Sequence, residues 1–139
     1  MRAVLDTNVL VAALRSRSGA SFELLRLWRA GKWTLILSNT VVAEYEEVLK
    51  RETLAIQLSP EEVDKFLDAL CFFAERRILQ KPWLPRLSDP DDEAFAQLAW
   101  EAQADYLVTF NIRHLAPLQK MGIPVLTPGK FLAKLGMKP

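Results

Sequence analysis

The chain has 139 residues, of which 50% are hydrophobic and 25% are charged, a size and composition that suit one globular domain with a single core. Its net charge of +1 excludes a general basic field, so any nucleic-acid binding must depend on local patches. One cysteine and one histidine exclude an internal disulfide and an ordinary Cys/His zinc site. Without a signal peptide or a long apolar run, we expect a cytoplasmic protein with no membrane segment.

The first segment joins a short apolar run to three polar side chains. Residues 3–5 predict a buried parallel strand, and Asn8 is placed to cap a helix over about 9–14. Asp6 would then lie at the carboxyl edge of the sheet, where open α/β folds bind ligands. Thr7 is its immediate neighbour.

A loop and a second helix are expected next. Residues 15–19 predict a flexible loop, in which Arg15 and Arg17 either contact phosphate or simply face solvent. A helix over about 22–29 has more apolar residues than one face needs, and core packing explains this surplus better than a partner does.

The segment 34–37 predicts a strand, and Ser38 to Thr40 supply capping side chains for a helix over about 41–52. Glu44 lies on the same helix face as the apolar Val41. A carboxylate there is costly unless a metal ion or a basic side chain meets it, and the spacing alone leaves both possibilities open.

A strong helix start at Ser59 predicts a helix that continues to about residue 76, with Phe72 and Phe73 as core residues. A short strand is expected over 78–80, followed by an extended connection over 81–85.

The densest acidic cluster, residues 88–93, begins another helix. Asp89 is expected to cap it, and acids in a first helical turn are favoured by the helix dipole, so helix chemistry alone could explain the cluster. Asp92, however, lies three residues before Phe95 and shares its buried face, whereas Asp91 does not. We therefore expect Asp92 to point inward, with Asp89 or Asp91 supporting it.

Two more strands complete the pattern. The first, over about 106–109, ends in Thr109 and is followed by Asn111, whose amide could serve a metal, a phosphate or a water. The lone His114 is a weaker candidate, because such a residue is more often a cap or a surface side chain than a general base. With a strand near 124–127 and a helix over 130–135, the order predicts a mostly parallel α/β sandwich.

Asp6, Glu44 and Asp92 thus come from three strand–helix units whose ends meet at one edge. Converging carboxylates repel one another unless a cation joins them, and oxygen-only ligands suit Mg²⁺ or Mn²⁺. The chemistry this favours is metal-assisted hydrolysis of a phosphodiester, which needs no protein nucleophile. Nucleotide-binding loops of the GxGxxG and Walker types are absent from the sequence.

Taken together, these motifs resemble the PIN domain family, the metal-dependent ribonucleases that include VapC-like toxins. The resemblance runs over nearly the whole chain, and its motifs are residues 5–8, Glu44, residues 89–92 leading into Phe95 and Ala99, and residues 104–109. It implies a three-layer α/β/α sandwich with a five-stranded, mostly parallel sheet, forming a single domain over 1–139.

The resemblance also implies a function and a site. It implies a Mg²⁺- or Mn²⁺-dependent endoribonuclease, the toxin of a toxin–antitoxin pair, with Asp6, Glu44 and Asp92 as metal ligands and Asn111 assisting. Many family members carry a fourth acid where Asn111 stands, so the second of two possible metal ions is the one weakened here. The remaining expected site residues orient the carboxylates or contact phosphate: Thr7, Asn8, Asp89, Asp91, Thr109 and Arg113.

Two other functions remain open from the sequence. One is a PIN-fold module that binds RNA or protein without cutting, and the other is a phosphatase acting on small phosphoesters. For the toxin, the resemblance further implies an RNA substrate, an antitoxin protein and a homodimer.

Overall fold

The computed structural model describes residues 1–85 and 87–136, and its centre is one sheet of five parallel strands. The sheet order is β3-β2-β1-β4-β5. The strands are β1 (Arg2–Leu5), β2 (Thr34–Leu37), β3 (Glu75–Arg76), β4 (Tyr106–Val108) and β5 (Val125–Leu126). The predicted α/β class and the five-stranded parallel sheet are confirmed.

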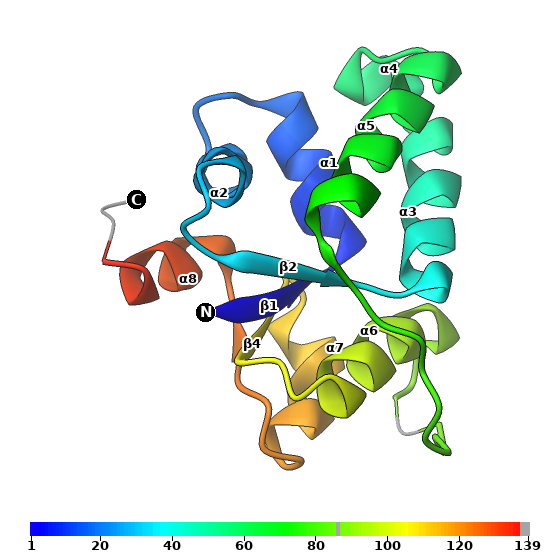
Figure 1. The fold of residues 1–139 in the computed structure, drawn as a ribbon, viewed down its shortest axis with the longest axis vertical. Coiled ribbons are helices and arrows are strands. Elements are labelled where there is room, and N and C mark those ends of the chain that lie inside the picture. Colours follow the sequence, from blue (N-terminus) through cyan, green and yellow to red (C-terminus); the bar gives the residue numbers. More distant parts are fainter. Residues whose placement is uncertain (86, 137–139) are drawn as a thin grey trace.

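Helices cover both faces of this sheet, so the fold has three layers, with α1 and α2 on one face and α6 and α7 on the other (Figure 1). The helices are α1 (Thr7–Arg15), α2 (Ala20–Arg29), α3 (Asn39–Arg51), α4 (Thr53–Ile56), α5 (Pro60–Phe73), α6 (Pro90–Glu101), α7 (Ile112–Gln119) and α8 (Pro128–Lys134). Within residues 1–85 and 87–136, no helix combines the length and apolarity needed to cross a membrane.

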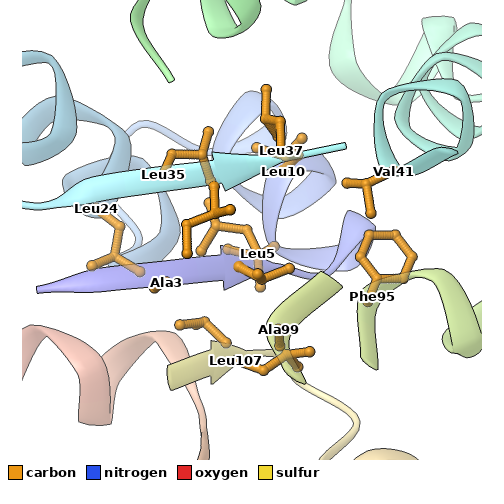
Figure 2. Packing of buried hydrophobic residues seen from close by; sticks show 14 of the residues in the cluster. Ala3, Leu5, Leu10, Leu24, Leu35, Leu37, Val41, Phe95, Ala99 and Leu107 are labelled. Carbon is orange, nitrogen blue, oxygen red and sulfur yellow. The ribbon is translucent and has the colours of Figure 1, made fainter. Parts of the chain in front are cut away.

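The central strands are apolar because helices bury them from both sides. In β1, Ala3, Val4 and Leu5 are fully buried. Figure 2 shows Leu10 of α1 and Leu24 of α2 approaching the sheet from one side. The predicted apolar surplus of α2 is therefore core packing, as expected, since Leu25, Leu27 and Trp28 are also buried.

Four local predictions were wrong. Asn8 does not cap α1, because Asp6 occupies that position and accepts the Thr7 backbone N–H. The helix expected to reach about residue 76 ends at Phe73, and the strand expected over 78–80 lies instead at Glu75–Arg76, because its partner strand β2 ends at Leu37 and offers no further pairing. Phe72 and Phe73 are 81% and 53% exposed, because α5 ends there beyond the edge of the core.

The topology places one crevice in the centre of the carboxyl edge. From β1, the chain adds β2 and β3 on one side and β4 and β5 on the other. In open parallel sheets, the crevice at such a reversal, outside the carboxyl ends of the strands, is where ligands bind. Here that crevice lies between the ends of β1 and β4, next to Asp6 and Thr109.

Candidate active site

Asp6 is buried directly after β1, with both carboxylate oxygens held by donors. Its backbone N–H bonds the carbonyl of Val108 at 2.9 Å, which ties it to the end of β4. Oδ1 accepts the Thr7 backbone N–H at 2.8 Å, and Oδ2 accepts the Thr109 hydroxyl at 2.7 Å. The side chain of Asp6 therefore has a set orientation at the crevice.

Thr109 extends this contact into a network that joins the ends of β1 and β4. Its Oγ1 accepts the backbone N–H of Asn111 at 2.9 Å and the side-chain amide of Asn8 at 3.4 Å. The Asn8 carbonyl oxygen in turn accepts the backbone N–H of Phe110 at 3.4 Å. Asn8 thus joins the first turn of α1 to the loop after β4, while Asn111 is exposed and makes no side-chain capping bond to α7.

Asp92 lies in the first turn of α6 and points inward, as the sequence predicts, while Asp91 is exposed. Asp89 caps this helix and accepts the Asp91 backbone N–H at 2.9 Å. The Oδ2 atom of Asp92 is buried without a hydrogen-bond partner in the described part of the chain. The Nδ1 atom of His114 lies 3.9 Å from it.

Burial and mutual repulsion make this site costly for negative charge. Burial, followed by the charges of Asp6 and Asp89, raises the pKa of Asp92 from 3.8 to about 6. Burial also raises the pKa of Asp6, although the hydrogen bonds from Thr109 and Thr7 oppose the shift. Such a site is stabilised by a proton or by a cation.

Glu44 lies close to the acids of α6 but is not gathered with Asp6. The buried face of α3 consists of Val41, Tyr45 and Leu49, and Glu44 is half-buried at its border. Burial and then the charge of Asp91 raise the pKa of Glu44. Glu44 therefore belongs to the same acidic region as Asp89 and Asp91.

The acids form two sets that share Asp89, whose charge raises the pKa of Asp6 and Asp92 and also that of Glu44. Across residues 1–85 and 87–136, no three acidic, histidine or cysteine side chains lie close enough together to hold one metal ion. The donors are nevertheless all carboxylate oxygens, and the buried, unpaired Oδ2 of Asp92 is an acceptor without a donor. This chemistry fits a hard divalent cation such as Mg²⁺ or Mn²⁺.

The sequence analysis did not identify Tyr45, although this residue contacts both the strand that precedes Asp6 and the helix that carries Asp92. Its hydroxyl donates to the carbonyl of Leu5 at 2.5 Å, and its ring packs on Phe95 with centroids 5.9 Å apart. Burial raises its pKa well above 10, so the phenol stays neutral and donates. The only sequence signal was its position four residues after Val41, on the buried helix face.

The predicted basic residues line three different pockets. Arg113 and His114 are exposed on α7 and line a pocket with Phe110 and Asn111. Arg15 lies at the end of α1 and lines a second pocket that includes Asn8.

Arg17 lines neither of these two pockets. Instead it lines a third pocket that includes Phe22 and Ile56. Arg17 is therefore the least suited of the predicted arginines to meet a substrate held by Asp6.

Comparison with known proteins identifies the fold independently. A family model described as "PIN domain" matches residues 2–113. A solved structure described as VapBC2 from Rickettsia felis, bound to a DNA fragment from their promoter, contains a similar chain, with a TM-score of 0.63 and 19% sequence identity. The match covers 91% of this chain and 98% of that one, and it shows a shared fold. No curated protein sequence matches the chain.

Proposed function

The chain belongs to the PIN domain family, and we propose that it is a metal-dependent endoribonuclease that hydrolyses RNA phosphodiester bonds. The observation that carries this proposal is the pair Asp6 and Asp92 at the central crevice, where one carboxylate oxygen is buried without a donor. Burial raises the pKa of both acids, and the charge of Asp6 adds to the shift of Asp92; acids perturbed in this way inside a cleft are candidates for functional sites.

In this proposal, Asp6, Asp92 and Glu44 hold Mg²⁺ or Mn²⁺. When bound, the ion would supply a water of lowered pKa and neutralise charge that grows on the leaving oxygen. Thr7 and Thr109 keep the Asp6 carboxylate in a single orientation through the bonds described above. Glu44, whose pKa is raised by burial and then by the charge of Asp91, would contribute its carboxylate to the ion from α3.

The other predicted residues support the ligands or the substrate. Asp89 and Asp91 add negative charge that attracts the cation, and Asp89 also begins α6 and so positions Asp92. The exposed Asn111 amide and the Arg113 guanidinium are available to hydrogen-bond a phosphate oxygen. Asn8 holds the loop that precedes α7, because it accepts the Phe110 backbone N–H.

The test is cleavage of a panel of structured and single-stranded RNAs by the purified protein with Mg²⁺, Mn²⁺ or EDTA. We expect metal-dependent cutting that is lost in Asp6→Asn, whose amide keeps the shape of the side chain but not its charge. Mononucleotides in the same assay separate an endoribonuclease from a phosphatase. Cutting in EDTA, or cutting by Asp6→Asn at the rate of the wild type, would contradict the proposal.

A second candidate is a PIN-fold module that binds RNA or protein without cutting it. The specific observation in its favour is that no three acidic, histidine or cysteine side chains of the described residues lie close enough together to hold one metal ion. If the folded protein binds RNA but cuts nothing with either metal ion, this second function replaces the first.

The biological role we propose is that of a cytoplasmic toxin, controlled by an antitoxin and acting as a homodimer. Support comes from the family and from the similar fold of the VapBC2 chain. A small neighbouring reading frame whose product co-purifies with this chain and suppresses its toxicity would support the role. Light scattering of the purified chain would test the dimer, and a monomer would contradict that part.

A further inference from the structure

A pocket of about 410 Å³ lies between α1 and α3, beside the acidic site. The side chains that line it and carry the argument are Asn8, Val11, Arg15, Val48, Glu52 and Phe110. The metal-ion chemistry proposed above uses none of them directly. The pocket is open to solvent and combines an aromatic ring, apolar walls and polar groups, which is the composition of a small-molecule subsite.

Hydrogen bonds link the wall of this pocket to the acidic site. Asn8 and Phe110 both line it, and the Phe110 backbone N–H donates to Asn8 at 3.4 Å. The Asn8 amide also donates to Thr109, which in turn donates to Asp6. A nucleotide whose phosphate lies at Asp6 therefore has this pocket beside it.

Its apolar part suits the flat face of a nucleobase. Phe110 is 51% exposed although it follows a fully buried threonine, so its ring is available for contact. Val11 and Val48, both half-buried, form walls on α1 and α3. Single-stranded RNA is recognised mostly through bases that stack on exposed aromatic rings in this way.

Two charged side chains of the pocket, Arg15 and Glu52, are available to hydrogen-bond the edge of that base. Arg15 and Glu52 are both exposed, and neither forms an ion pair with any described residue. A guanidinium donates to carbonyl or phosphate oxygens, whereas a carboxylate accepts from the amino groups of guanine, adenine and cytosine. Uracil has no amino group, and its one edge donor, the N3–H, lies between two carbonyl oxygens that repel a carboxylate accepting from it.

We propose that this pocket binds one nucleobase of the RNA substrate next to the scissile phosphate, with Phe110 stacking on it and Glu52 selecting against uracil. The inference rests on the proposed function, because it takes RNA as the ligand. It adds a source of sequence preference, which the acids cannot supply because they contact only phosphate.

Sequencing the ends produced from a randomised RNA library tests the preference. For the wild type, uracil should be depleted at one position fixed relative to the cut, and Glu52→Gln should abolish that depletion. Phe110→Ala should raise KM about tenfold with a smaller change in kcat, and Phe110→Tyr should restore it. Matched controls are Asp68→Asn and Phe72→Ala, two exposed residues of α5 that do not line the pocket and should change neither readout.

A second measurement does not depend on cutting. An oligonucleotide that contains 2-aminopurine is titrated with the Asp6→Asn protein, where stacking on Phe110 should change the fluorescence. The change should disappear in Asp6→Asn/Phe110→Ala, whose fold is checked by thermal unfolding.

The two measurements separate the possible failures. Unchanged cut sites in the Glu52 and Phe110 variants, with no fluorescence change, would overturn the inference while leaving the nuclease intact. A Phe110-dependent fluorescence change without any cutting would keep the pocket and overturn the nuclease. If the Phe110 variant instead loses only binding of a protein partner, the pocket is a protein-binding site and the inference fails.

Discussion

Two charged residues, Arg2 and Asp6, lie at the two ends of strand β1, only four positions apart. The structure pairs the charge of Arg2 with an opposite charge and leaves that of Asp6 without one. At the amino end, the Arg2 guanidinium makes two hydrogen bonds to the Glu75 carboxylate, at 2.9 and 2.7 Å, and further bonds to the carbonyls of Ala102 and Gln103. At the carboxyl end, Asp6 has no cation of its own within ion-pair distance in the described chain.

The pKa directions express this difference. The Glu75 hydrogen bond raises the pKa of Arg2, and the Arg2 hydrogen bond lowers the pKa of Glu75, so both charged forms are stabilised by folding. At the other end, the pKa values of Asp6 and Asp92 are raised, so folding disfavours their charged forms. One end therefore stabilises the fold, and the other reduces stability in exchange for a site that attracts a cation.

The largest effect we expect is on activity, from Asp92→Asn. The amide keeps the volume and removes the charge, so cleavage in Mg²⁺ should fall about 100-fold or more. Metal-dependent RNA cleavage and circular dichroism, measured on the same preparation, check this. A folded variant that retains a tenth or more of the wild-type rate would show that cleavage does not depend on the charge of Asp92.

The second expected effect is on stability, from Arg2→Met at the opposite end. The methionine fills similar space but leaves the half-buried Glu75 carboxylate without its main partner, so the free energy of unfolding should fall by about 1–3 kcal/mol. Urea unfolding measures this change. Activity per folded molecule should stay at the wild-type level. A loss of activity without a loss of stability would contradict the view that the amino end of β1 serves stability alone.

The sequence predicted the carboxyl end better than the amino end. Asp6, Thr109 and Asp92 were identified because strand ends and helix faces follow from local patterns, and the structure buries all three at or beside one crevice. The pairing of Arg2 with Glu75 was not identified, because these residues are 73 positions apart and meet only through the strand order. The position of β3 was wrong for the same reason, since its bounds depend on where β2 ends.

Glu44 shows the limit of arguments from a helix face. Spacing from Val41 predicted that Glu44 points toward the apolar side of its helix, but the buried stripe passes through Tyr45, so Glu44 is half-buried at the border of that stripe. Which acids it faces depends on the angle between α3 and α6, a quantity that periodicity does not contain.

The third prediction concerns the pH dependence of stability in EDTA. With a pKa of about 6 in the folded state and an ordinary value of 3.8, Asp92 binds a proton more tightly when folded. Its contribution to stability is therefore present below about pH 4 and lost as pH rises toward 6, by about 1–2 kcal/mol after allowance for solvent screening. Glu75, whose pKa is lowered, contributes the opposite slope, since its stabilisation is lost as pH falls below its ordinary 4.5.

Unfolding free energies of the wild type, Asp92→Asn and Glu75→Gln between pH 4 and 7 separate the two ends. Relative to the wild type, Asp92→Asn should gain stability as pH rises, and Glu75→Gln should lose it. Parallel curves for all three proteins would contradict the opposite signs.

The smallest expected effect comes from His114→Gln, which tests whether the carboxyl end has a cation after all. The imidazole Nδ1 lies 3.9 Å from Asp92 Oδ2, and its positive form lowers the pKa of both Asp92 and Asp6. Its side chain is 56% exposed, however, so solvent screens the interaction. The rate at pH 7.5 should change by less than about threefold, and the acidic limb of the pH–rate profile should move slightly upward. A loss of about 100-fold at all pH values would instead make His114 a catalytic residue, because an exposed neighbour that only adjusts the charge of Asp92 cannot produce so large an effect.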